Sequence, residues 1–259
     1  MNQEERRRFL IEELLRERLS CRRQEIPADT DRQKVLLRSL MNVRHPGAIS
    51  QRFLEVQDAY LQGELAAKKI TRLSELSPLQ NGIYLWRGDI TTLDCGAIVN
   101  AANSGMTGCY QPCHNCIDNC IHTFAGVQLR LKCAEIMEQQ GYEEPTGQVK
   151  ITPAYNLPCD YVIHTVGPIV RGELTRQHCE LLKSCYRSCL ELADENNVGS
   201  IAFCCISTGI FMFPNDRAAE IAVQTVQEYK AETGSKIEVV FNVFKEQDER
   251  IYRKLLSAD

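Results

Sequence analysis

A dense group of cysteine and histidine side chains lies between residues 109 and 122. Four Cys and two His fall within this short segment, which also contains Pro112. Thiolate and imidazole are the ligands that zinc prefers, and cysteines that only fill a core would rarely gather in a proline-containing loop. The segment therefore predicts a zinc site, with a redox or disulfide cluster as the alternative. These residues alone do not decide which side chains bind the metal.

Three further segments carry polar and small residues directly after predicted strands. Asp89, in the segment 88–91, can accept hydrogen bonds from an adenine amino group or a ribose hydroxyl, or can cap a turn. Asn103, in the segment 100–105, offers a donor and an acceptor to a sugar diol, although turn chemistry explains the segment equally well. The segment 207–214 combines hydroxyls, a glycine and backbone amides before a helix, which suits a phosphate group. The sequence has no Walker or dinucleotide-binding glycine motif.

Short apolar segments rich in β-branched residues alternate with helical segments from residue 83 onward. Strands are expected near 83–91, 96–103, 161–168, 200–208 and 236–244, and helices near 117–140, 174–196, 215–231 and 246–257. Because the strands are apolar on both faces, helices should cover them on both sides. This alternation predicts a three-layer α/β/α sandwich with a mixed, largely parallel sheet. Ligands of such sheets bind beyond the carboxyl ends of the strands.

The segment 1–70 has a different pattern. Helical spacing of apolar residues occurs in 3–20, where it includes Leu19, then after Pro27, and again in 49–67. We therefore expect residues 1–70 to form a helical extension that packs on a main domain at 71–259. The core of that main domain is expected at about 83–257.

Composition restricts the class of protein further. The net charge of −4 argues against sequence-independent nucleic-acid binding, which needs a basic surface. The sequence contains no apolar run long enough to span a membrane, and the first residues do not resemble a signal peptide. We therefore expect a cytoplasmic protein that interacts with neither nucleic acid nor membrane. Most of the 13 cysteines should then be reduced core residues.

Taken together and in order, these segments resemble the macrodomain family. The matching pieces are GDIT (88–91), IVNAAN (98–103), IDNCIHTFAG (117–126), YVIHTVGP (161–168) and STGIFMFP (207–214), and the resemblance covers about residues 83–257. It implies a cleft that binds ADP-ribose, with Asp89 and Ile90 at the adenine end and Asn103 at the distal ribose. The residues that it implies around the diphosphate are Ser207, Thr208, Gly209, Ile210 and Phe211. Phe244, after the last strand, would line the adenine pocket or belong to the core.

A smaller, zinc-containing branch of this family carries the pattern Cys-x4-His-x-Cys. This sequence has the pattern at Cys109, His114 and Cys116, and the resemblance to the branch extends to the helical extension. It implies one zinc ion per chain, held by three ligands, with the fourth position open for water or substrate. Cys113 lies outside the pattern. It is either a fourth ligand that would close a structural site or an unrelated neighbour.

Asp118 is the expected catalytic carboxylate. It matches the catalytic position of macrodomains that hydrolyse ADP-ribose linkages, where it could orient a water or the distal ribose. Its structural alternative is a negative charge at the start of a helix, which the helix dipole favours. Asn103 is expected to act with it. His122, one turn later, could pair with Asp118, but we expect His122 and His164 to be structural.

The resemblance implies a zinc-dependent hydrolase that removes mono-ADP-ribose from protein side chains, with Asp or Glu esters as the expected linkage. The zinc would lie near C1 of the distal ribose, where it would polarise the linkage or supply a hydroxide-like water. The alternatives are a non-catalytic ADP-ribose reader with a structural zinc and an O-acetyl-ADP-ribose deacetylase. Members of this branch are linked to sirtuin-like ADP-ribosyltransferases that act on lipoyl-carrier proteins. A modified carrier of that kind is therefore the implied protein substrate.

Overall fold

The main domain is built on one six-stranded sheet. The computed structural model describes residues 1–18 and 25–257. The strand order is β2-β8-β7-β4-β6-β5, and the strands are parallel except β5, which pairs antiparallel with β6 at the edge. Their bounds are β2 (Ile83–Arg87), β4 (Ala97–Ala102), β5 (Val149–Pro153), β6 (Tyr161–Val166), β7 (Ser200–Phe203) and β8 (Glu238–Val243).

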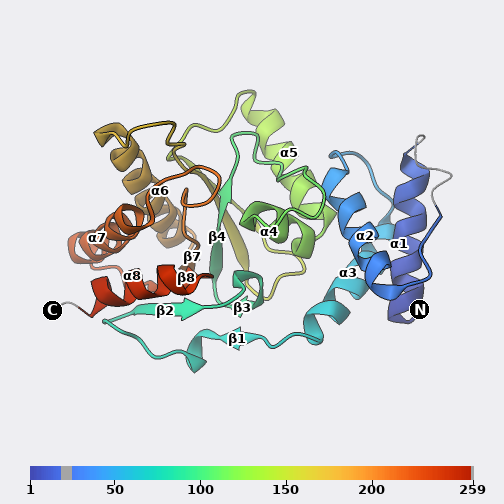
Figure 1. The fold of residues 1–259 in the computed structure, drawn as a ribbon, viewed down its shortest axis with the longest axis horizontal. Coiled ribbons are helices and arrows are strands. Elements are labelled where there is room, and N and C mark those ends of the chain that lie inside the picture. Colours follow the sequence, from blue (N-terminus) through green and yellow to red (C-terminus); the bar gives the residue numbers. More distant parts are fainter. Residues whose placement is uncertain (19–24, 258–259) are drawn as a thin grey trace.

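Helices cover both faces of the sheet because its central strands are apolar on both faces. Ile98 and Val99 are adjacent residues of β4 that point to opposite faces, and both are fully buried. Helices α4 (Ile117–Ala125) and α5 (Val127–Gln140) lie on one side of β4, and α6 (Arg176–Glu195) and α7 (Asn215–Thr233) on the other (Figure 1). Helix α8 (Glu246–Leu256) packs against β2 and β8. The predicted three-layer fold with a largely parallel sheet is confirmed.

Two elements differ from the sequence prediction. The single helix expected over 117–140 is two helices, which meet at Gly126 with a φ of 97°. A side chain at Gly126 would clash with Gln57, because its Cβ would lie 2.6 Å from Gln57 Nε2. Gln57 Oε1 instead accepts the first N–H of α5, from Val127, at 2.9 Å. The edge strand β5 was not located in advance, since it is short and only partly buried.

The segment 1–70 contains three helices, α1 (Gln3–Glu17), α2 (Thr30–Val43) and α3 (Gln51–Ala66), which lie beyond α4 and α5 (Figure 1). Leu19, assigned above to the first helix, lies outside the described residues. Asn2, Asp29 and Ser50 cap the three helices, each with a side-chain oxygen that accepts a backbone N–H. The helices share a small apolar core that includes Val127 of α5, so the extension packs on the main domain.

Short elements, including a separate two-stranded sheet, follow the extension and lead into the main domain. Strand β1 (Thr71–Arg72) pairs parallel with β3 (Leu93–Asp94), and the 3-10 helix η2 (Leu73–Glu75) follows β1.

Across residues 1–18 and 25–257, no helix combines the length and the apolar character needed to cross a bilayer.

Candidate functional site

Parallel pairing brings the predicted binding segments to one edge of the sheet. Strands β2, β8, β7 and β4 run in the same direction, so their carboxyl ends meet at that edge. The residues that follow these strands include Asp89, Phe244, Ser207 and Asn103, respectively. Open α/β sheets bind ligands at this edge.

Asp89 caps the 3-10 helix η3 (Ile90–Thr92). One of its carboxylate oxygens hydrogen-bonds within the protein, and the other faces the solvent. Oδ1 accepts hydrogen bonds from the N–H and the hydroxyl of Thr91, at 3.0 and 2.7 Å. Oδ2 lies 3.7 Å from Lys68 Nζ, and the side chain is 42% exposed. The side chain of Ile90 is buried in the core, so only its backbone could meet a ligand.

The loop 207–213 carries backbone amides without a protein partner. The N–H groups of residues 212 and 213 donate back to carbonyls within the loop, each at 3.0 Å. In the described part of the chain, the N–H groups of the three preceding residues, 209–211, have no protein acceptor. Such a row of free amides before a helix suits an anionic group. Ser207, with a φ of 65°, adds a buried hydroxyl that also lacks a partner.

Two apolar side chains that follow strands β7 and β8 are exposed, one in this loop and one directly after β8. Ile210 and Phe244 are 68% and 79% exposed. Phe244 therefore does not belong to the core, which was the alternative for it. Thr208 turns inward instead, and its hydroxyl donates to the carbonyl of Cys205 at 3.0 Å. The loop thus presents free backbone amides and an exposed apolar side chain, and of its two hydroxyl groups only that of Thr208 is used within the described part of the protein.

A buried carboxylate lies where α4 meets the end of β4. The two oxygens of Asp118 accept hydrogen bonds from Asn100 Nδ2 at 2.9 Å and from Asn103 Nδ2 at 3.2 Å. Burial raises the pKa of Asp118 to about 6, against the lowering effect of those two amides. His122 Nε2 lies 3.6 Å from Asp118 Oδ1. Asp118 is therefore held by two donors at the carboxyl end of β4, and it also lies in the first turn of α4.

A chain of hydrogen bonds continues from Asp118 into the sheet. Asn100 Nδ2 also lies 3.1 Å from His164 Nδ1, and His164 Nε2 lies 3.0 Å from Thr152 Oγ1. Because an amide nitrogen donates, His164 Nδ1 must accept, and the ring proton must lie on Nε2. Burial lowers the pKa of His164 to about 3. His164 is thus a neutral structural residue, as expected from its apolar strand.

The buried His164 predicts a loss of stability in acid. Its pKa in the folded protein lies below the unfolded value of about 6.5, so the free energy of unfolding should fall as the pH drops from 6.5 towards 3. His164→Gln keeps a donor and an acceptor but cannot be protonated. Between pH 7 and pH 5, urea denaturation should show wild type losing about 2 kcal/mol more than this variant. Equal losses would contradict the assignment, since all other titrating groups are shared.

The three predicted metal ligands lie together. The ligand atoms of Cys109, His114 and Cys116 are all within 4.8 Å of one another, and Cys109 Sγ is 3.6 Å from His114 Nδ1. Burial raises the pKa of the Cys116 thiol, with a smaller contribution in the same direction from the nearby Cys109. Two sulfur atoms and one imidazole form a donor set that fits zinc.

Cys113 does not join this group. Its Sγ lies 3.5 Å from the carbonyl oxygen of Val35 in α2, and its backbone N–H donates to Asn42 Oδ1 at 2.8 Å. Cys113 therefore faces the extension, and the group in this loop that could hold a metal ion has three members, Cys109, His114 and Cys116. Every cysteine among the described residues is free, so no disulfide competes with the group there.

Sequence reasoning did not identify several residues that position the site. Asn100 was a detectable one, because a polar residue in a strand as apolar as β4 needs a buried partner. Arg38, Asn42 and Asn119 gave no such signal. They hydrogen-bond the loop that carries the candidate metal ligands, but Arg38 and Asn42 come from α2, far before that loop in the chain.

Comparison with known proteins agrees with this geometry. A family model described as "Macro domain" matches residues 99–222. The chain is 63% identical over 261 residues to a protein-ADP-ribose hydrolase of Treponema medium, covering 99% of this chain and 100% of that protein. It is 49% identical over 253 residues to a protein-ADP-ribose hydrolase of Staphylococcus aureus (strain MSSA476), covering 97% and 95%.

A solved structure has the same fold. The Trypanosoma brucei macrodomain in complex with ADP-ribose superposes with a TM-score of 0.66 at 30% sequence identity, covering 84% of this chain and 94% of that one. The sequence matches extend over nearly the whole chain, including the helical extension. The sheet order and these similarities in sequence and structure agree, and the chain belongs to the macrodomain family.

Proposed function

We propose that this protein is a zinc-dependent hydrolase that removes mono-ADP-ribose from modified Asp or Glu side chains of proteins. One observation carries the proposal: the Cys109–His114–Cys116 group and the buried carboxylate of Asp118 flank the start of α4, where Asp118 follows Cys116 by a single intervening residue. The Treponema and Staphylococcus relatives are named protein-ADP-ribose hydrolases, which supports the removal of ADP-ribose from proteins. The ligand of the Trypanosoma macrodomain supports ADP-ribose as the bound group.

In this proposal the loops that follow the carboxyl ends of β2, β4 and β7 bind ADP-ribose and fix its position. The free amides of residues 209–211 donate to the diphosphate, and the solvent-facing oxygen of Asp89 accepts from the adenine end. Asn103 uses both of its N–H bonds within the protein, on Gly108 and Asp118. Its Oδ1 accepts one N–H, from Gly105, so one lone pair is left for a hydroxyl of the distal ribose. Fixing the nucleotide in this way holds the ester bond near the reacting groups.

The catalytic step needs an activated water and a polarised ester. A zinc ion held by Cys109, His114 and Cys116 would supply Lewis-acid polarisation and an open coordination position. Asp118 accepts one amide hydrogen bond on each oxygen, so each oxygen keeps acceptor capacity for a water or a ribose hydroxyl. We assign Asp118 the role of orienting that water.

The protein substrate that we propose is a lipoyl-carrier protein modified by a sirtuin-like ADP-ribosyltransferase. This part of the proposal rests on the resemblance to the zinc-containing branch alone. The chemistry of the site is the same for any ester of ADP-ribose, so the protein partner and the reaction have to be tested separately.

The test is release of ADP-ribose from a protein modified on Asp or Glu side chains, followed by mass spectrometry. We expect wild type to release free ADP-ribose and to leave an unmodified carboxylate. O-acetyl-ADP-ribose is the parallel substrate, and faster release of acetate from it would make the protein a deacetylase. Binding of ADP-ribose without release from either substrate would make it a reader.

Gly209→Val is the variant that should weaken ADP-ribose binding while the protein stays folded. A Cβ at Gly209 would meet nothing within 4 Å, so the fold can accept a side chain that would block the free amides. We expect ADP-ribose binding, measured by calorimetry, to weaken at least about 10-fold, because charged hydrogen bonds are lost. Gly199→Val, at the other end of β7 and equally open, is the control and should bind normally.

A further inference from the structure

Helix α2 of the extension contacts the metal-binding loop, residues 109–116, directly. We propose that this helix raises the metal affinity of the site, because it holds the loop in the conformation that brings the three ligands together. The inference rests on the proposed function in one respect, namely that the loop binds zinc. It goes further in assigning the extension a role in metal affinity, through residues that are not ligands.

Asn42 is the first of these contacts. It is 1% exposed and lies near the end of α2. Its Oδ1 accepts the N–H of Cys113 at 2.8 Å, and its Nδ2 donates to Thr123 Oγ1 in α4 at 2.8 Å. Cys113 has a φ of 53°, a conformation that a residue other than glycine adopts only when its surroundings fix it. Asn42 thus fixes the turn immediately before the ligand His114.

Arg38, one turn earlier in α2, holds the ligand residues themselves. Its Nη2 donates to the carbonyl of His114 at 2.7 Å and to Asn119 Oδ1 at 3.1 Å. Asn119 is fully buried, and its Nδ2 donates to the carbonyl of Cys109 at 3.3 Å, while its N–H donates to Cys116 Sγ at 3.4 Å. Arg38 and Asn119 together therefore touch all three ligand residues.

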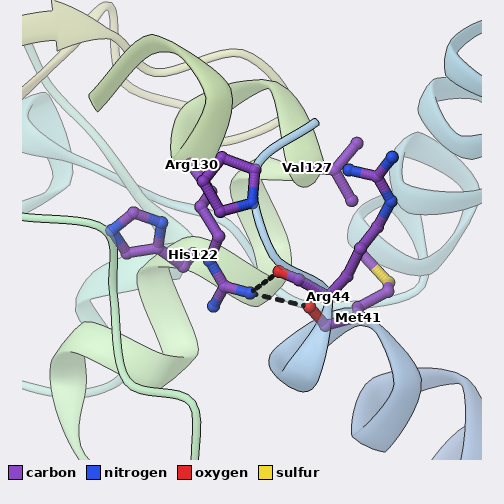
Figure 2. A pocket seen from close by; sticks show the side chains of 6 residues that line it. Met41, Arg44, His122, Val127 and Arg130 are labelled. Atoms are coloured by element: carbon purple, nitrogen blue, oxygen red, sulfur yellow. Dashed lines mark hydrogen bonds between the residues drawn. The ribbon is translucent and has the colours of Figure 1, made fainter. Parts of the chain in front are cut away.

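Arg130 of α5 joins the end of α2 to the same loop. Its Nη1 donates to the carbonyls of Met41 and Arg44, at 3.1 and 2.6 Å, which satisfies acceptors at a helix end with no basic residue in its last turn (Figure 2). Its guanidinium lies 4.4 Å from the ring of Tyr110 in the loop, and His45 stacks on that ring at 5.1 Å. Tyr110 is thereby in contact with both the main domain and the extension.

These contacts determine how much the loop must reorganise when it binds metal. A loop held in its ligand-presenting conformation loses little freedom on binding, whereas a free loop must be ordered at that moment. Residues that orient metal ligands typically change metal affinity by about 10- to 100-fold when they are removed. The extension should therefore raise the zinc affinity of the loop by such a factor without contributing a ligand.

The test is zinc affinity measured on the full chain by competition with a chelator. Asn42→Ala should raise the zinc dissociation constant about 10-fold or more. Asn42→Asp keeps an acceptor for the Cys113 N–H and should restore most of the affinity. The matched control is Gln62→Ala, which removes another hydrogen bond between extension and main domain, from Gln62 Nε2 to the Asn156 carbonyl at 3.1 Å, away from the metal loop. It should leave the dissociation constant within about 2-fold.

Arg38→Met is the second variant, which keeps the apolar stem and removes the donors, and it should also weaken zinc binding. Co²⁺ absorption bands would show whether the ligand set is retained in each variant. If wild type binds zinc and both Asn42→Ala and Arg38→Met bind it equally well, the inference is overturned while the proposed function stands. If wild type itself binds no zinc, the proposed metal chemistry fails, and the inference fails with it.

Discussion

Cys116→Ser should lower the rate of ADP-ribose release about 1,000-fold, equivalent to about 4 kcal/mol of transition-state stabilisation, and should reduce bound zinc from one per chain to almost none. Ser is a poor ligand for zinc but a good helix cap. This matters because Cys116 Sγ caps α4 by accepting the N–H of Asn119. The substitution therefore removes the proposed zinc ligand and preserves the start of the helix. Metal analysis and the release assay would be made on the same preparation.

The matched control for this variant is Cys113→Ser. Cys113 lies in the same loop, but its Sγ contacts the carbonyl of Val35 and does not belong to the ligand group. The Cys113→Ser protein should therefore keep its zinc and most of its activity. Binding of free ADP-ribose should persist in both variants, because the free amides lie in the separate loop 207–213. Full turnover by a zinc-free Cys116→Ser protein would exclude a catalytic metal.

The fold was predictable because its information is local. Strands such as β4 are short and mostly apolar, and the alternation with amphipathic helices leaves few other architectures. The break between α4 and α5 was not predictable, because it depends on the approach of Gln57 from the extension to Gly126. Gly at that position is compatible with an uninterrupted helix as far as the local sequence shows.

The same distinction applies to the site. Cys109, His114 and Cys116 lie on the connection from β4 to α4, and Asp118 lies in the first turn of α4, so their spacing and a family resemblance were enough to single them out as candidate site residues. Ile90 was expected at the ligand, but its side chain is 2% exposed, because a residue that follows Asp89 into η3 turns towards the core. Arg38 and Asn42 were missed because their partners are 76 and 71 residues away. A single sequence gives no sign of such pairs.

Asp118→Asn should slow ADP-ribose release about 100-fold while zinc content stays unchanged. The side chain keeps its size, but a carboxamide has one acceptor oxygen in place of two and carries no negative charge with which to orient the water. It also cannot accept from both Asn100 and Asn103, because its own NH₂ group must face one of those donors. The unpaired donor should cost about 1–3 kcal/mol of stability, measurable by urea denaturation. ADP-ribose affinity should change little, since the free amides proposed to bind the diphosphate lie in the separate loop 207–213.

The control for this variant is Asp94→Asn, which makes the same chemical change on a side chain that is 48% exposed. It should leave the release rate within about 2-fold of wild type. The comparison decides between the two roles considered for Asp118. If it only balanced the dipole of α4, its loss would reduce stability and leave turnover near that of the Asp94 control. A 100-fold loss of turnover in a folded, zinc-containing protein requires that the carboxylate acts on the substrate or on the attacking water.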